Sequence, residues 1–173
     1  MFTSPAPRAS GRRPANAAFS LLELSVVVTI ISILVAIAVP TAKNLIFRSR
    51  SSAAQNDLRV FAAAFQAYAH EKGDWPEGDG TPGAIPPGME AYLNSTAWRH
   101  PTPIGGNYTW DPNSTQQGAR YRAVIGIYST DKNPVTSDRN QLLDLDRAAD
   151  DGNLAAGNLL LGYRNYPIFL LEH

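Results

Sequence analysis

The sequence contains no cysteine and only three histidines, and both shortages narrow the functional classes. Without cysteine there is no disulfide, no thiolate zinc site and no cysteine nucleophile. The histidines, His70, His100 and His173, are scattered and show no metal-ligand spacing. Phosphate-binding loops, the Gly-x-Ser-x-Gly elbow and the His-Glu-x-x-His motif are also missing from the sequence. The sequence therefore predicts a protein that is not an enzyme.

The chain also lacks a net charge, because 15 basic residues balance 15 acidic ones. The balance is uneven along the chain, since the first 18 residues contain three arginines and no acids. The remaining 12 basic and 15 acidic residues leave a mildly acidic body. Such a body has no general electrostatic attraction for nucleic acid, so we expect no nucleic-acid partner.

One long apolar run is present, at residues 19–39 (FSLLELSVVVTIISILVAIAV). As a helix it would span roughly 30 Å, the thickness of a bilayer core, so we expect a membrane-spanning segment with lipid as a partner. Glu23 is its only charge. This carboxylate either snorkels to the interface or pairs with a positive group on a neighbouring subunit.

Two simpler explanations of the apolar run exist. A cleavable secretory signal would use Ala36-Ile37-Ala38 as its cleavage site. However, the apolar part of such signals runs to about 7–15 residues, whereas this one is longer and contains Glu23. A plain single-span anchor is the other explanation. Charge does not decide its orientation, because three basic residues lie on each side: Arg8, Arg12 and Arg13 before it, and Lys43, Arg48 and Arg50 after it.

The rest of the chain divides into three stretches. Residues 1–18 are rich in Pro, Ala and Ser and have the composition of a disordered leader. Residues 40–72 continue the helical pattern, with an apolar stripe at Leu58, Phe61, Phe65 and Tyr68 and a stop at Gly73. Because proline lacks the N–H for a helical hydrogen bond, we expect the helix to bend or loosen near Pro40. Residues 73–173 contain most of the glycines and prolines and form the predicted globular head.

Short β-strands dominate the predicted head. Alternation within Tyr121–Tyr128 is typical of a half-buried antiparallel strand. Pro167 indicates that the last strand starts late or lies on an edge. A short helix is expected at Met89–Leu93, and the large aromatic residues are expected to pack on Phe61 and Phe65. The four expected strand regions are Asn107–Trp110, Arg120–Ser129, Leu159–Tyr163 and Tyr166–Leu171. The predicted fold class is α+β, with a long N-terminal helix, half membrane-embedded and half amphipathic, packed on a small antiparallel sheet.

The start of the apolar run carries a resemblance to a known family. The segment Ala18-Phe19-Ser20-Leu21-Leu22-Glu23-Leu24, followed by an apolar helix and Pro40, resembles the class III signal of type IV prepilins and type II secretion pseudopilins. The resemblance is close over residues 18–60 and weak afterwards. The family usually has glycine where this sequence has Ala18, which is also a small residue.

The resemblance implies processing and assembly. A prepilin peptidase would cut between Ala18 and Phe19 at the cytoplasmic membrane face and methylate the new amino group of Phe19. Glu23 would become the fifth residue of the processed chain, and Pro40 would lie where the family usually has a proline. The mature protein would be a single-pass protein of the bacterial inner membrane, with a cytoplasmic leader and a periplasmic head. Its partners would be other pilin-like subunits and an inner-membrane assembly platform.

Three functions fit this resemblance. The first is a pseudopilin subunit of a type II secretion filament. The second is a major or minor type IV pilin serving adhesion, motility or DNA uptake. The third is a membrane-anchored periplasmic binding protein that does not polymerise. The missing cysteines favour the pseudopilin, because many type IV pilins close their C-terminal loop with a disulfide.

An acidic cluster in the head is a candidate metal site. Four aspartates lie close together around Gly152, at Asp144, Asp146, Asp150 and Asp151. We expect this segment to form a loop, and clustered oxygen ligands on a loop suit Ca²⁺, although the spacing is not that of an EF-hand. Major pseudopilins hold a calcium ion in a loop near this part of their sheet, so the resemblance favours the same cofactor here. The alternative is a solvated turn built on Asp151-Gly152-Asn153.

Overall fold

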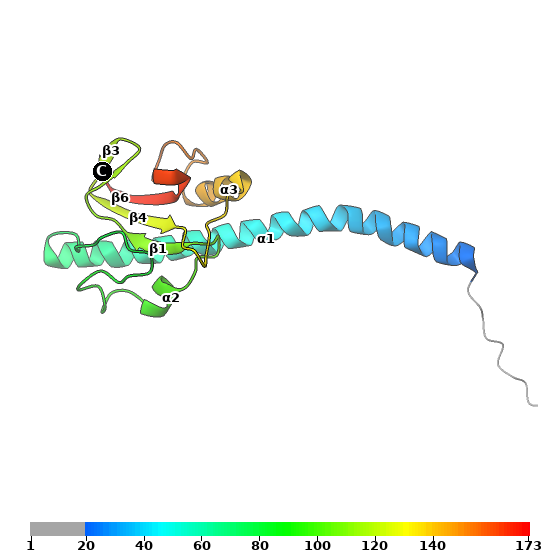
Figure 1. The fold of residues 1–173 in the computed structure, drawn as a ribbon, viewed down its shortest axis with the longest axis horizontal. Coiled ribbons are helices and arrows are strands. Elements are labelled where there is room, and N and C mark those ends of the chain that lie inside the picture. The colour runs from blue at the N-terminus through cyan, green and yellow to red at the C-terminus, as the bar shows by residue number, and fades with distance from the viewer. Residues whose placement is uncertain (1–19) are drawn as a thin grey trace, which may run out of the picture. The chain divides into compact units, whose positions relative to one another are not determined.

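The computed structural model describes residues 20–173 and divides the chain between Thr41 and Ala42. Residues 42–173 form one compact unit, which contains the later part of the long N-terminal helix together with the predicted head, and from here on we call this whole unit the head. A single helix, α1 (Leu21–Lys72), contributes its first residues to the N-terminal unit and its last residues to the head. The predicted fold class is confirmed, because a long N-terminal helix is followed by a small antiparallel sheet packed on it (Figure 1).

The part of α1 that lies in the head is amphipathic as predicted. Leu58, Phe61 and Phe65 are buried, and Tyr68, the last residue of the predicted stripe, is half-buried. Residues at helical spacing lie on one face, so this stripe faces the sheet while the other side remains exposed. The helix ends where expected: Gly73 adopts a positive φ of 83°, and its N–H donates to the carbonyl of Ala69 at 2.8 Å.

The main sheet has four antiparallel strands in the order β1-β4-β6-β5. Its strands are β1 (Asn107–Trp110), β4 (Ala123–Tyr128), β6 (Pro167–Glu172) and β5 (Leu159–Leu161). β6 starts at Pro167 and lies inside the sheet, where a proline is tolerated as the first residue of a strand. The remaining elements are the hairpin β2 (Ser114–Gln116) and β3 (Ala119–Tyr121), the helices α2 (Ser95–Arg99) and α3 (Arg139–Ala149), and a 3-10 turn, η1 (Tyr163–Asn165).

β4 is buried on both faces, which corrects the prediction of a half-buried strand. Ala123, Ile125 and Ile127 face the main core, so the predicted alternation identifies that face. The opposite face is buried as well, because Val124 packs with apolar residues of β6 in a second, smaller cluster. A strand at the centre of a sheet with apolar neighbours on both sides loses its polar face.

Two local predictions are also wrong. Met89–Leu93 forms a single turn, in which the N–H groups of Tyr92 and Leu93 both point to the carbonyl of Met89. The helix comes directly afterwards as α2, because the Asn94 side chain caps the N–H groups of its first turn. The second error concerns the acidic segment. It was expected to be a loop, but its first half is the helix α3.

Aromatic residues join α1 to the sheet, as predicted. Phe61 packs edge-on against Trp98 and Tyr108, with ring centroids 5.0 and 4.9 Å away. Phe65 stacks on Trp110 at 4.0 Å. Such large buried rings contribute much of the apolar area of a small core.

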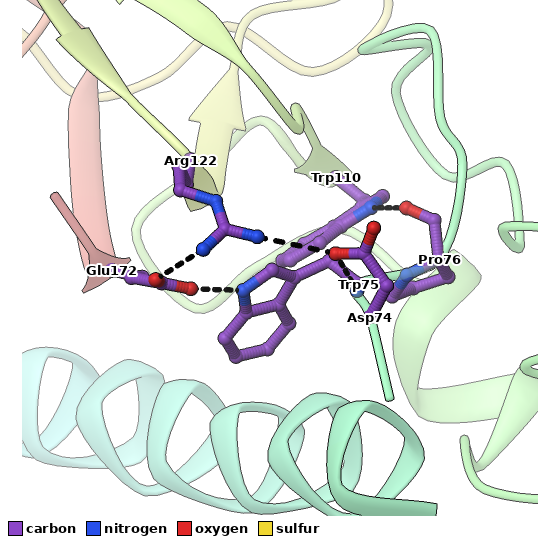
Figure 2. A network of polar contacts seen from close by, with 6 residues as sticks. All are labelled: Asp74, Trp75, Pro76, Trp110, Arg122 and Glu172. Atoms are coloured by element: carbon purple, nitrogen blue, oxygen red, sulfur yellow. Dashed lines mark hydrogen bonds and ion pairs between the residues drawn. The ribbon is translucent and has the colours of Figure 1, made fainter. Parts of the chain in front are cut away.

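A polar network fixes the loop that follows α1 (Figure 2). The Trp110 indole donates to the carbonyl of Pro76 at 2.8 Å, and the Trp75 indole donates to the carboxylate of Glu172. Arg122 bridges the two acids of the network, reaching Glu172 at 2.7 Å and Asp74 at 3.3 Å. The end of α1 is therefore tied to the end of β6 and to the residue before β4.

Candidate functional site

The first half of α1 is apolar and exposed. Every residue from 20 to 46 is exposed, and the exposed fractions of Leu21, Ile37 and Leu34 are 87%, 66% and 61%. Contiguous apolar surface of this kind is unfavourable in water and marks a contact with lipid or with another protein. Among residues 20–173, α1 is the one helix long and apolar enough to cross a membrane.

The polar atoms inside this apolar stretch are satisfied within the helix. The Thr29 hydroxyl donates to the carbonyl of Ser25 at 2.8 Å, and the Ser32 hydroxyl donates to the carbonyl of Val28 at 2.7 Å. Hydroxyl groups bonded to the preceding turn need no partner from the solvent. The mild polar interruptions of the run are therefore compatible with an apolar environment.

Glu23 and Ser20 form a reciprocal cap at the start of α1. The backbone N–H of Ser20 donates to a Glu23 carboxylate oxygen at 2.9 Å, and the N–H of Glu23 donates to the Ser20 hydroxyl at 3.1 Å. This capping box satisfies two backbone donors that the helix leaves unpaired. It also holds the carboxylate at the N-terminal end of the apolar segment. The Ser-x-x-Glu spacing is the sequence signature of such a cap and would have predicted it.

The other predicted processing and assembly residues are placed only in part. Ala18 and Phe19 lie outside the described residues. Pro40 lies inside α1, and the bend expected there stays a prediction.

Three of the four predicted aspartates come together in the head. Ligand atoms of Asp146, Asp150 and Asp151 all lie within 4.8 Å of one another. The sequence brings them together because Asp146 lies in the last turn of α3, Asp150 caps that helix, and Asp151 follows in a turn. The C-terminal end of a helix carries partial negative charge, which makes this a costly place for three carboxylates. These three carboxylates are close enough together to hold a cation.

Asp146 is the most unusual member of the cluster. Its exposed fraction is 0%, and neither carboxylate oxygen has a hydrogen-bond partner. Burial raises the pKa of Asp146 to about 6, and the charges of Asp151 and Asp150 add to the rise. The nearby backbone N–H groups of Gly152 and Asn153 oppose it. A buried, unpartnered carboxylate is costly unless something compensates it, and a metal ion would do so.

Asp144 is not part of this cluster. It lies two residues before Asp146 on α3 and therefore points to a different side of the helix. Its carboxylate lies 3.4 Å from the guanidinium of Arg147. The sequence already contained the signal for this division, because Leu142, Leu145 and Ala149 mark an apolar helical face that includes Asp146 but not Asp144.

Comparisons with known proteins bear on the N-terminal segment. Residues 13–39 match the family described as the prokaryotic N-terminal methylation motif. The chain is 36% identical over 77 residues to the fimbrial protein EcpC of Eikenella corrodens. This aligned region covers 44% of this chain and 50% of that protein. It is 40% identical over 65 residues to the type IV major pilin protein PilA of Myxococcus xanthus (strain DK1622). This second aligned region covers 38% of this chain and 30% of that protein.

The chain carries an N-terminal segment of the type IV pilin-like kind. The matched motif covers the apolar run and Glu23, so the similarity lies where the geometry is most unusual for a soluble domain. The chain spans half the length of one relative and about a third of the other. The head of the chain therefore has to be interpreted from its own residues.

Proposed function

We propose that this chain is a structural, non-enzymatic subunit of a helical filament that is assembled at a bacterial inner membrane. The exposed apolar helix headed by Glu23 is the observation that carries the proposal. In the membrane this helix lies in lipid, and in the filament it lies among the helices of other subunits. Both environments remove the same apolar surface from water, so the subunit can move from one to the other.

Processing supplies the second element of assembly. Prepilin peptidase cuts between Ala18 and Phe19 and methylates the new amino group. That amino group is positive, and Glu23 of an adjoining subunit is negative. In an apolar environment their attraction offsets much of the cost of burying either charge. Because the capping box holds the carboxylate at one end of the helix, one axial stagger brings the two groups together.

Among the possible filaments, we propose a type II secretion filament, in which the chain is a pseudopilin. The missing cysteines and the acidic cluster support this choice. A major or minor type IV pilin is the alternative, and the names of the two relatives favour it. In either case the partners are other pilin-like subunits and an inner-membrane assembly platform, and the head lies on the periplasmic side.

Three measurements test this function. The intact mass of the membrane-extracted protein should correspond to a chain that begins at Phe19 and carries one methyl group. A chain that begins at Val39 would instead indicate a secretory signal. The protein should then be recovered in filaments sheared from the cell surface. Deletion of the gene should block protein secretion for a pseudopilin, or remove pili for a type IV pilin. A processed protein that never enters filaments would be a membrane-anchored binding protein.

We also propose that Asp146, Asp150 and Asp151 hold Ca²⁺ in the folded head. The buried, unpartnered carboxylate of Asp146 supports this site. Three carboxylates with neighbouring backbone carbonyls provide the hard oxygen ligands that calcium prefers. The ion would tie the last turn of α3 to the segment that leads into β5. Its role would be structural, since it stabilises the surface that the head offers to neighbouring subunits.

A further inference from the structure

One end of the head carries an acidic loop, residues 77–80, between α1 and α2. Glu77 and Asp79 are exposed, and neither has an ion-pair partner among the described residues. The loop is held in place along the edge of β1, since the N–H of Gly80 donates to the carbonyl of Trp110 at 3.1 Å. The two carboxylates are therefore presented by a fixed backbone.

The other end of the head carries a basic cleft of about 340 Å³ between residues 135–142 and 161–166. Arg139 and Arg164 line it, both are exposed, and neither has a carboxylate partner within residues 20–173. Thr136 and Ser137 add hydroxyl groups. Asp138 lies beside the cleft, but its carboxylate caps α3 by accepting from the N–H of Asn140 at 2.9 Å. The cleft thus offers two cations and several hydrogen-bond donors.

The backbone at Arg164 is strained. Arg164 and Asn165 have positive φ angles of 55° and 60°, and the turn is closed by the N–H of Gly162, which donates to the carbonyl of Tyr166 at 2.8 Å. Asparagine tolerates this region, whereas arginine rarely adopts it. Strained backbone persists only where the surrounding structure holds it in place, and such residues cluster at functional sites. Here the strain places Arg164 on the rim of the cleft.

The two features are too far apart to meet within one chain. The first turn of α3 lies beside Ser51, whose hydroxyl donates to the carbonyl of Gln141 at 3.1 Å. The acidic loop is hydrogen-bonded to Trp110, which stacks on Phe65, and the 14 helical residues from Ser51 to Phe65 span about 21 Å. Charges this distant are screened from each other, because the Debye length is about 8 Å at physiological salt.

We propose that the acidic loop of one subunit docks into the basic cleft of a second copy of this chain. The proposal rests on the filament function and adds a contact between heads to the contact between apolar helices. Two carboxylates meet two guanidinium groups, and Arg–carboxylate pairs can form two parallel hydrogen bonds. Because the two surfaces are different and lie at opposite ends, the contact is heterologous and extends in one direction without closing.

A second copy explains both surfaces together. An anionic lipid headgroup could neutralise Arg139 and Arg164, but it would leave Glu77 and Asp79 without a partner. The acids next to the loop are already used, because Glu71 pairs with Lys72, and Asp74 and Glu172 pair with Arg122. Among the acids of residues 71–79, Glu77 and Asp79 are therefore the two without an ion pair in the described part of the chain.

A charge swap in the full-length chain tests the contact. The acid variant carries Glu77→Lys and Asp79→Lys, the base variant carries Arg139→Glu and Arg164→Glu, and the third chain carries all four changes. Each two-residue variant should yield at least about fivefold fewer sheared filaments than wild type, and the four-residue variant should recover most of the loss. Loss in the base variant alone, without recovery, would assign the cleft to another anion and overturn the proposal. Wild-type yield from both two-residue variants would overturn it too, while leaving the filament function intact.

Proximity can be measured directly, because the chain has no cysteine of its own. Thr81→Cys and Ser137→Cys place one thiol beside each surface, and both positions are exposed. In filaments assembled from the doubly substituted chain, a bifunctional maleimide should link the subunits into a ladder. A mixture of the two single-cysteine chains should give no product longer than a dimer. Filaments without cross-links would overturn the docking, whereas the absence of filaments from the wild-type chain would overturn the proposed function.

Discussion

The hydroxyl of Tyr108 donates a 2.9 Å hydrogen bond to the carboxylate of Asp57, and this bond joins β1 to the middle of α1 in the head. Tyr108 is almost fully buried, with an exposed fraction of 1%. Burial raises the pKa of its hydroxyl well above the usual value, and the charge and hydrogen bond of Asp57 raise it further. The hydroxyl therefore stays a donor at every physiological pH.

This bond should contribute measurably to the stability of the head. Tyr108→Phe removes the donor and should lower the free energy of unfolding by about 1 kcal/mol. Asp57→Ala leaves a buried hydroxyl unpaired and should cost about 1–3 kcal/mol. Urea unfolding of residues 42–173, followed by tryptophan fluorescence, measures both. The double variant should lose less than the sum of the two single losses, and strictly additive losses would show that the bond is not formed.

Calcium should stabilise the head through Asp146 and not through Asp144. Ca²⁺ at a hundredfold excess over its dissociation constant should stabilise the wild-type head by about 2.7 kcal/mol relative to chelator. Asp146→Asn should abolish this increment and should also raise the melting temperature in chelator, because it removes a buried charge. Asp144→Asn is the matched control and should keep the calcium response. Equal melting of the wild type with calcium and with chelator would leave the cluster as a solvated turn.

The same carboxylate predicts a pH dependence in the absence of calcium. The pKa of Asp146 is about 6 in the folded head, against 3.8 in the unfolded chain. The folded state therefore favours the protonated form of the carboxyl group. Its contribution to stability is fully present below about pH 3.8 and is lost as the pH rises through about 6. The measured quantity is the difference in unfolding free energy between Asp146→Asn and wild type in chelator. From about pH 4 to about pH 7 the variant should become more stable relative to wild type. A difference that stays constant with pH would contradict the raised pKa of Asp146.

Assembly variants should separate the charge of Glu23 from its capping role. Glu23→Gln keeps a side chain that can accept the Ser20 N–H but removes the charge, so it should insert and be processed yet give few filaments. Ser20→Ala removes the hydroxyl half of the cap and keeps the charge, and it should assemble almost normally. Filament yield and the intact mass of the membrane-extracted protein report the two steps. Normal yield from Glu23→Gln would exclude the charge pair.

Much of this fold is predictable because its main signals are local. The stripe of Leu58, Phe61 and Phe65 repeats at helical spacing, and the structure confirms that it faces the core. The bounds of β1 are also predicted correctly, since Asn107–Trp110 follows two glycines and precedes Asp111-Pro112. Gly73 stops α1 as expected. In each case the deciding residues lie within a few positions of the element.

The errors arise where distant residues decide. The alternating pattern predicts that Val124 is exposed. It is buried because Ile168 and Leu170 of β6, more than forty positions later in the sequence, pack against it. Asp146 looks like a loop residue until Leu142 and Leu145 turn its helix toward the core. The capping box of Ser20 and Glu23 is different, because its sequence signal is local. Glu23 was interpreted only through its charge, so its capping role was missed. Tertiary burial overrides local patterns in the first two cases.

The position of β6 sets the order in which the head can form. β6 follows every other described element in sequence, yet it pairs with β4 on one side and β5 on the other. Without it, β5 has no neighbour in the sheet and the second apolar cluster loses Ile168 and Leu170. The pairing of β5 and the closure of the second cluster therefore have to wait for the last strand, and contacts of such long range form slowly. If the head crosses a membrane as proposed above, this delay is an advantage, because β5 and the second apolar cluster stay open until the last strand arrives.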